Sequence, residues 1–300
     1  MRILFIAPNR IGDAVIASGV IDYLIRTHPN SRITVACGTP AGGVFQRMPN
    51  LERLILVEKR PRDMHWIALW RQVVRHRWDL VVDTKGSALA YLVRTRRRAI
   101  YRSGPLRKYE QYAATIGLSP APLPTTWTNA DDRTKAATLL PPDRPWIGFG
   151  PTANWSGKLW PPDRFAALAA RLAAGPIPGA NIAILGGHGP QERAMAEPLL
   201  AALPQAIDLC GKLTIAETAA CIARSALYVG NDSGLMHLAA ATGTPTIGLC
   251  GSTIDRAEEM APAGRHAAWA MATDQSMEAL SVETALAACE TLLRQAREAA

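Results

Sequence analysis

An acidic residue follows the first apolar segment of the chain, at the start of a predicted helix. Residues 3–7 form a short apolar run, and Asp13 comes soon after it. In open α/β sheets, ligands bind beyond the carboxyl ends of the strands, which is where Asp13 would lie. A carboxylate there could serve as a general base. The alternative, which position alone favours, is that Asp13 caps the helix by accepting backbone N–H groups.

A second polar segment follows a later apolar run, over residues 148–161. Thr152, Asn154 and Lys158 lie in this loop, before a Pro-Pro pair opens a helix. Hydroxyl, amide and ammonium groups are suited to a phosphate, although the GxxxxGK[ST] pattern of a P-loop is missing. From the spacing alone, an ordinary surface loop is an equally good interpretation.

The strongest chemical signal is the segment 230–237, Gly-Asn-Asp-Ser-Gly-Leu-Met-His. An apolar strand leads here directly into a turn of small residues and then into a helix. The N–H groups of Ser233, Gly234 and the next residue would be free at that helix start, and with the helix dipole they form an anion site. Asp232 would lie beside this site, with His237 further along the helix. The alternative is an Asp cap and a core His.

A weaker signal is the glycine-rich run over residues 186–189, followed by Glu192. Glycines let a ligand approach the backbone, and an acid after such a loop can hold a ribose hydroxyl. A plain turn is the simpler interpretation. After the first strand the chain has Ile-Gly-Asp at 11–13 in place of GxGxxG, which argues against a nicotinamide-dependent oxidoreductase.

Short apolar runs alternate with segments of helical period along both halves of the chain, which predicts two doubly wound α/β domains. The predicted strands are 3–7, 33–37, 54–57, 80–83, 99–101, 146–150, 182–186, 207–210, 227–230, 246–250 and 267–271. The predicted helices are 16–25, 64–75, 87–94, 108–116, 162–173, 192–203, 215–223, 235–242 and 282–298. Residues 119–145 contain several prolines and are predicted as an irregular connection and linker. The 300 residues suffice for two domains, which we place at 1–145 and 146–300.

Charge is distributed unevenly between the two halves. Residues 1–145 hold 23 Lys and Arg against 11 Asp and Glu, whereas the second half holds 10 against 14. The basic half would therefore face an anionic partner, unless its charges form a solvated face. Trp66 and Trp70 are spaced to form one buried helix face, so they do not favour single-stranded nucleic acid as that partner.

Composition places the chain among soluble globular proteins of a reducing compartment. The five cysteines form no CxxC pair, which disfavours a disulfide framework and a zinc site. The apolar stretch at the N-terminus is too short for the core of a signal peptide. No apolar run reaches the length of a membrane-spanning helix. We therefore expect a cytoplasmic protein.

Taken in order, these segments resemble glycosyltransferase family 9, the ADP-heptose:lipopolysaccharide heptosyltransferases, over nearly the whole chain. The likeness rests on residues 11–13 (Ile-Gly-Asp), 83–87 (Asp-Thr-Lys-Gly-Ser), 158–161 (Lys-Leu-Trp-Pro), 231–240 (Asn-Asp-Ser-Gly-Leu-Met-His-Leu-Ala-Ala) and 243–245 (Gly-Thr-Pro). It implies a GT-B fold, in which two Rossmann-like domains face each other across a cleft. The N-terminal domain would bind the acceptor and the C-terminal domain the nucleotide sugar. The final helix, 282–298, could pack back toward the first domain.

The resemblance also implies catalytic roles. Asp13 matches the general base that deprotonates the acceptor hydroxyl in a single inverting displacement. Lys158 matches the lysine that holds the donor diphosphate and neutralises the leaving group.

Further residues are matched to the two substrates. Asp232 would bind hydroxyls of the donor sugar, Ser233 and Gly234 the phosphates, and Glu192 the ribose. The full donor-binding set comprises Thr152, Asn154, Lys158, Glu192, Asp232, Ser233, Gly234 and His237. Acceptor binding is assigned to Lys85, Arg97 and Arg98 in the basic domain.

The expected function is transfer of heptose from ADP-heptose to a lipopolysaccharide core precursor. The acceptor would be an anionic glycolipid at the cytoplasmic face of the inner membrane, so we expect peripheral contact with that membrane. We expect no metal or other cofactor and no nucleic-acid partner. The alternatives are a GT-B transferase with another nucleotide sugar, a sugar-nucleotide epimerase, and a catalytically silent protein that binds a sugar nucleotide.

Overall fold

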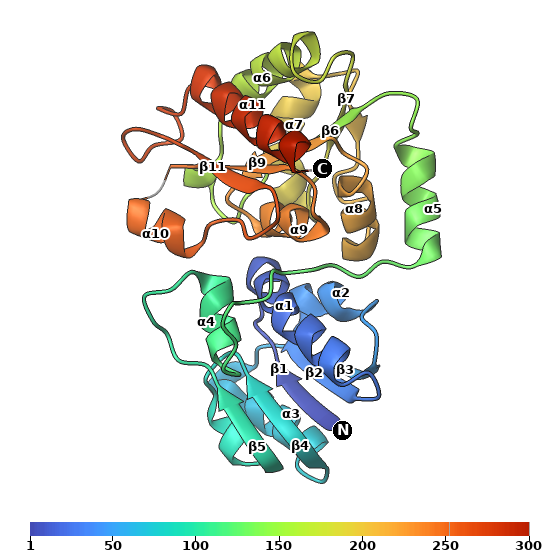
Figure 1. Cartoon of the computed structure of the whole chain (residues 1–300), viewed down its shortest axis with the longest axis vertical. Helices are drawn as coiled ribbons and strands as arrows, with labels where there is room; N and C mark the ends of the chain where they lie inside the picture. The colour runs from blue at the N-terminus through green and yellow to red at the C-terminus, as the bar shows by residue number, and fades with distance from the viewer. Residues whose placement is uncertain (252, 300) are drawn as a thin grey trace. The chain divides into compact units, whose positions relative to one another are not determined.

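The computed structural model describes residues 1–251 and 253–299, and it divides into two compact units (Figure 1). The first unit is Met1–Trp127 and the second begins at Thr128, not at the predicted residue 146. The difference comes from helix α5 (Ala130–Leu139), which packs against α8 (Ile215–Ile222) in the second unit. The two helices are also joined by an ion pair, in which Lys135 Nζ lies 2.8 Å from Glu217 Oε1.

Helix α5 also corrects the prediction that residues 119–145 are irregular. Its start carries a capping box in which the Asn129 side chain accepts from the backbone N–H of Asp132 at 2.8 Å. The Asp132 carboxylate in turn accepts from the backbone N–H of Asn129 at 2.9 Å. Two donors at the helix start are satisfied in this way, which stabilises a short polar helix. The neighbouring prolines lie outside α5, so they do not interrupt it.

The first unit is built on five parallel strands in the order β3-β2-β1-β4-β5. The strands are β1 (Arg2–Ile6), β2 (Arg32–Gly38), β3 (Leu51–Val57), β4 (Arg77–Asp83) and β5 (Arg94–Ile100). The helices are α1 (Ile11–Thr27), α2 (Gly42–Phe45), α3 (Met64–Val73) and α4 (Lys108–Ala114). Strand β1 is central and almost wholly buried, because apolar side chains extend from both of its faces. The predicted doubly wound arrangement is confirmed for this unit.

The connection from β4 to β5 is unusually short. Parallel strands are normally joined by a dozen or more residues that include an α-helix. Here residues 84–93 make the connection, with only the 3-10 helix η3 (Ala88–Tyr91) between the strands. The predicted α-helix over 87–94 is therefore wrong, and Arg94 already belongs to β5. The predicted burial of the Trp66 and Trp70 face is also wrong, since Trp70 is 36% exposed.

The second unit is built on six parallel strands in the order β11-β10-β9-β6-β7-β8. The strands are β6 (Trp146–Gly150), β7 (Asn181–Ile184), β8 (Ile207–Asp208), β9 (Leu227–Asn231), β10 (Thr246–Cys250) and β11 (Ala267–Met271). Besides α5 and α8, the helices are α6 (Pro162–Ala174), α7 (Pro190–Ala202), α9 (Gly234–Thr242), α10 (Ile254–Glu259) and α11 (Val282–Glu298). The predicted alternation of strand and helix is confirmed here too. No helix in the described ranges has both the length and the apolarity that crossing a membrane requires.

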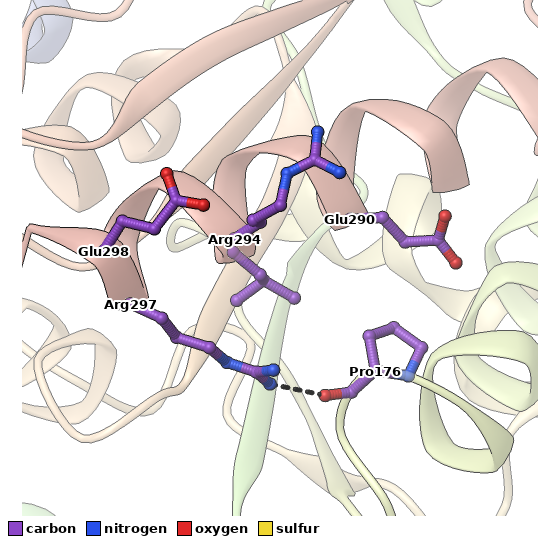
Figure 2. Close-up of a pocket in the computed structure, with 6 residues that line it drawn as sticks. Pro176, Glu290, Arg294, Arg297 and Glu298 are labelled. Atoms are coloured by element: carbon purple, nitrogen blue, oxygen red, sulfur yellow. Dashed lines mark hydrogen bonds between the residues drawn. The ribbon is translucent and has the colours of Figure 1, made fainter.

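Helix α11 packs within the second unit against β10, β11 and α6. Near its end, Arg297 donates a hydrogen bond of 2.9 Å to the carbonyl oxygen of Pro176, in the loop after α6 (Figure 2). An open hollow of about 390 Å³ lies at this contact, lined by Pro176 and by residues of α11. None of the lining residues is a predicted site residue, so the hollow adds nothing to the candidate site.

The side chain of a buried tyrosine in the second sheet fills space next to two glycines, where the Cβ atom of any other residue would collide with it. Tyr228 of β9 is fully buried, and β6 and β9 are paired in register from Gly148–Tyr228 to Gly150–Gly230. A Cβ atom at Gly150 would overlap the Tyr228 hydroxyl, and one at Gly230 would lie 2.7 Å from it. Within the described part of the chain, that hydroxyl has no hydrogen-bond partner. Burial raises the pKa of Tyr228.

We predict that Gly150→Ala lowers the free energy of unfolding by about 1–3 kcal/mol, the usual cost of overpacking a core. Urea unfolding measures this, with Gly104→Ala as the control because a Cβ there meets no atom within 4 Å. In a Tyr228→Phe background the cost should fall, since the overlapping oxygen is gone. An equal cost in both backgrounds would contradict this account of the strain.

Candidate functional site

The ends of β6 and β9 bring two predicted segments together in the second unit. The strands are neighbours, so the loop after Gly150 and the turn after Asn231 start from the same edge of the sheet. Asn231 is fully buried and joins them. Its amide donates to the carbonyl oxygen of Pro151 at 2.7 Å and accepts from the backbone N–H of Trp160 at 3.1 Å. Asn231 therefore holds both ends of the 151–160 loop against the turn.

Lys158 and Asp232 form an ion pair between that loop and that turn. The Lys158 ammonium donates to Oδ2 of Asp232, and the two side chains are only 16% and 13% exposed. An ion pair so poorly solvated is stronger than a surface pair, and removal of one partner leaves an uncompensated charge. The structure thus places the two predicted charged residues in direct contact. Asp232 pairs with Lys158 and is not the cap of helix α9.

Helix α9 starts immediately after Asp232. Ser233 is its N-cap residue, in an extended conformation, and its side chain makes no capping hydrogen bond. In the ranges described, the buried Ser233 hydroxyl has no hydrogen-bond partner. The first N–H groups of a helix have no acceptor within the helix, so those at the start of α9 add positive potential. His237 follows inside α9 and is 4% exposed, as the core interpretation also expected.

The two polar residues before Lys158 lie in different environments. Thr152 is buried, with its methyl group against the space beside Gly186 at the end of β7. Asn154 is exposed on the outer part of the same loop. Thr152 is therefore buried where the ends of β6 and β7 meet. Asn154 lies at the surface, where only a ligand in solvent could contact it.

Glu192 lies in the first turn of α7 and organises the glycine-rich loop before it. Its Oε2 atom accepts a hydrogen bond of 2.9 Å from the backbone N–H of Gly187. The next residue, Arg193, donates to Oδ2 of Asp208 at 2.6 Å, which ties α7 to β8. Burial alone would raise the pKa of Asp208, but hydrogen bonds from Lys212, Arg193 and a backbone N–H lower it to about 2.

In the first unit, Asp13 occupies the first turn of α1 and is half-buried. Arg10 is the N-cap of this helix, so Asp13 is not its cap. Across the described ranges, no hydrogen bond or ion pair engages the Asp13 carboxylate. Asp13 therefore keeps a carboxylate that is not engaged within its own unit.

Asp83 and Lys85 form a second polar group in the first unit. Asp83 is fully buried, and its carboxylate accepts from the backbone N–H groups of Lys85 (2.9 Å) and Ser87 (2.8 Å) and from the Ser87 hydroxyl (2.6 Å). Asp83 therefore shapes the loop that carries Lys85. The Lys85 ammonium lies 3.1 Å from Oδ1 of Asn9, in the loop before α1. Desolvation lowers the pKa of Lys85, and the charge of Asp83 opposes that shift.

The two predicted acceptor arginines differ in what they contact. Arg97 is exposed on the edge strand β5. Arg98 donates from Nε to the carbonyl oxygen of Ala90 at 2.7 Å and from Nη2 to that of Val93 at 3.3 Å. These bonds attach β5 to η3. Much of the Arg98 hydrogen-bonding capacity is therefore used inside the unit.

Asn231 is the site residue that the sequence reasoning did not single out. The signal was present, because a buried amide at the end of an apolar strand needs hydrogen-bond partners. Those partners lie far away in the sequence, and only the pairing of β6 with β9 identifies them.

A family model and a curated relative identify the family to which the chain belongs. The family described as glycosyltransferase family 9 (heptosyltransferase) matches residues 106–288. Lipooligosaccharide heptosyltransferase 2 of Haemophilus influenzae is 25% identical over 295 residues, which cover 84% of each chain. Its curated name is that of a heptosyltransferase, and the match spans both units.

Two solved structures share the fold. A family 9 glycosyl transferase from Veillonella parvula has a TM-score of 0.81 at 20% identity, covering 98% of this chain and 97% of its own. ADP-heptose lps heptosyltransferase II of E. coli has a TM-score of 0.78 at 21% identity, and the match covers 99% of this chain and 100% of the E. coli chain. The predicted GT-B architecture of two parallel-sheet α/β domains is confirmed by these structures.

We predict that Asp208→Asn removes an acid-sensitive part of the stability. The pKa of Asp208 in the folded protein is about 2, below the ordinary value of an Asp. Its contribution is therefore complete above about pH 4 and is lost as the pH falls toward 2. The contribution should not exceed about 1 kcal/mol, because its partners Arg193 and Lys212 are about half exposed.

Unfolding by urea between pH 2 and pH 7 measures this difference, with Glu197→Gln as the matched control on the other side of Arg193. The variant and the wild type should converge at the acid end. A gap that stays constant over this pH range would rule out the assigned role of Asp208.

Proposed function

Because the chain belongs to glycosyltransferase family 9, the heptosyltransferases, we propose that it transfers heptose from ADP-heptose to the anionic core precursor of lipopolysaccharide. The observation that carries the proposal is the poorly solvated Lys158–Asp232 pair beside the start of α9. A cation, a carboxylate and a helix N-terminus lie together there, and these groups suit a sugar diphosphate. The names of the relatives from H. influenzae and E. coli support the same donor and reaction class.

The second unit binds the donor in this proposal. The diphosphate takes Lys158 as its counterion and also accepts from the Ser233 hydroxyl and the N–H of Gly234. Asp232, released from Lys158, accepts from hydroxyls of the sugar. The free oxygen of Glu192 accepts from the ribose. Thr152, Asn154 and His237 complete the donor site.

The leaving group is stabilised by charges that belong to the chain. As the bond to the anomeric carbon breaks, negative charge grows on the departing diphosphate oxygen. Once the donor is bound, the Lys158 ammonium and the dipole of α9 neutralise this charge. In this mechanism no metal or other cofactor is needed to stabilise the leaving group.

The first unit binds and activates the acceptor. Asp13 takes the proton of the acceptor hydroxyl while that oxygen forms a bond to the anomeric carbon. The bond from that carbon to the diphosphate oxygen breaks in the same step, and ADP leaves with the electron pair. One displacement inverts the anomeric configuration. Lys85 and Arg97 bind anionic groups of the acceptor, with Arg98 as a weaker contributor because its guanidinium is bound to carbonyl groups.

We also propose that the protein contacts a membrane surface through its basic first unit. Residues 1–127 hold 20 Lys and Arg against 8 Asp and Glu. Such a basic unit is attracted to an anionic leaflet by about 1 kcal/mol for each Lys or Arg near the surface. We place the protein in the cytoplasm, in peripheral contact with the inner membrane.

We predict that Asp13→Asn lowers kcat for heptose transfer at least about 100-fold, because an amide cannot accept the proton. ADP affinity should stay within about twofold of the wild-type value. Asp22→Asn is the matched control, since Asp22 lies on the same helix in an exposed pair with Arg26. If Asp13→Asn keeps more than a tenth of the wild-type turnover, the assigned base is wrong.

We predict that ADP raises the melting temperature more than UDP, GDP or NAD does at matched concentration. A ligand at about 100 times its dissociation constant adds about 2.7 kcal/mol to the stability of the folded state. Lys158→Met should weaken ADP binding at least about tenfold, whereas Lys135→Met, in an exposed pair, should not change it. Selective stabilisation by UDP or GDP would mean that the donor is a sugar linked to that nucleotide and not to ADP. Stabilisation by NAD alone would contradict the proposed transferase activity.

A further inference from the structure

A hollow in the first unit lies apart from the residues assigned to the donor. Its volume is about 400 Å³, within the range of small-molecule sites. Trp66, Ile67 and Trp70 of α3 line one side, and Leu89 and Leu92 of the β4–β5 connection line the other. Lys85 and Ser87 are the polar members of the lining. The hollow is thus an apolar groove with a single cation.

The short β4–β5 connection explains why this groove exists. A full crossover helix would cover the neighbouring face of α3, but η3 has only four residues. Ile67 is left 43% exposed and Leu92 61% exposed. The Trp70 indole N–H donates to the carbonyl oxygen of Leu92 at 3.0 Å, which holds the two walls together. The walls of the groove are thus fixed by the chain's own contacts, and exposed apolar surface of this kind is typical of interaction sites.

Lys85 connects the groove to the edge where the acceptor would react. Its ammonium lies 4.5 Å from the centroid of the Trp66 ring. The same group contacts Asn9 in the loop that precedes α1, the helix of Asp13. A ligand with an anionic group at Lys85 and an apolar part along Trp66 and Trp70 would match both ends of the groove.

We propose that this groove binds a hydrocarbon chain of the glycolipid acceptor, with an anionic group of its head at Lys85. The identity of the acceptor rests on the proposed function. The chemistry of the chain rests on the lining, because each buried methylene gains from leaving water. A sugar ring would lose water from its hydroxyls along the apolar walls, where Lys85 and Ser87 are the polar side chains of the lining. A second protein copy is disfavoured by size, since eight residues line the groove against about 20–30 a side in a standard interface.

Binding is tested with a single-chain alkyl phosphate brominated along its chain, used below its micelle concentration. Bromine in the groove should quench the fluorescence of Trp66 and Trp70 saturably. Leu92→Glu should raise the half-saturating concentration at least tenfold, because it places a negative charge on the apolar rim. Leu123→Glu is the matched control at another exposed leucine of the same unit and should change nothing.

The charged end is tested separately with Lys85→Gln. This variant should weaken binding of the alkyl phosphate but not of an alkyl glucoside with the same brominated chain. Absence of saturable quenching in the wild type would overturn the proposal, as would equal behaviour of Leu92→Glu and Leu123→Glu. The protein could instead bind phosphatidylglycerol vesicles through Leu92 while the monomeric probe causes no quenching. That result would overturn the proposed chain site and identify the groove as a membrane-contact surface.

The acceptor is tested by comparing an acylated precursor with its deacylated form. The ratio of their kcat/KM values should fall at least tenfold in Leu92→Glu and stay unchanged in Leu123→Glu. An unchanged ratio in Leu92→Glu would mean that the chain bound in the groove is not that of the acceptor. If no heptose transfer is found at all, the proposed function fails, while the quenching experiment still decides the chemistry of the groove.

Discussion

The ion pair between Lys158 and Asp232 is the interaction on which the rest of the candidate site depends. Both groups are largely removed from water, so the loss of either partner would leave the other charge poorly solvated, at a large cost in free energy. A donor with an anionic diphosphate and a hydroxylated sugar offers each group a replacement. In the function we propose, the diphosphate takes over Lys158 and the sugar hydroxyls take over Asp232. A ligand with only one of these features would leave one charge unpaired, so the proposal predicts that the pair contributes to specificity.

Buried hydrogen bonds fix this pair in space. Asn231 fastens the loop of Lys158 at two points, while Asp232 follows it directly in the chain. In the first unit, Asp83 plays the corresponding part for the loop of Lys85. Asp13 differs from Asp83, because three donors surround the Asp83 carboxylate whereas none among residues 1–251 and 253–299 donates to that of Asp13. Asp83 near the end of β4 thus has a structural part, whereas Asp13 after β1 is the aspartate to which we assign chemistry.

The sequence predicted those parts of the fold whose pattern is local. Most strands of both sheets are short apolar runs, and most helices between them show a helical period, so the alternation of strand and helix could be predicted. Strand β5 is an exception, because its first five residues include four arginines. Helix α5 was missed because it is short and polar and lies near prolines; its stability comes from a cap and from packing on α8. The opposite error at 87–94 arose because helical spacing cannot reveal that β5 already begins at Arg94. Strand pairing with β4 decides that point.

The candidate site shows the same limit. Residue types and spacing made Asp13, Lys158 and Asp232 candidates, because each lies in a polar segment that follows an apolar strand. Their proposed roles came from the resemblance to family 9 and not from the spacing. Residue types and spacing could not reveal that Lys158 pairs with Asp232, since 74 positions separate the two residues. Nor could they show that Arg98 is bound to carbonyl groups of its own unit. Contacts of this kind depend on the sheet order, which local pattern does not contain.

The most direct test of the central claim is the configuration of the new glycosidic bond. The protein would be incubated with ADP-heptose and a lipopolysaccharide core precursor, and the one-bond carbon–hydrogen coupling at the transferred anomeric centre would be measured by NMR. A single displacement assisted by Asp13 predicts a product of inverted configuration, released together with ADP. A product that retains the configuration of the donor would require a covalent or ion-pair intermediate, and it would contradict the mechanism built on Asp13, Lys158 and Asp232.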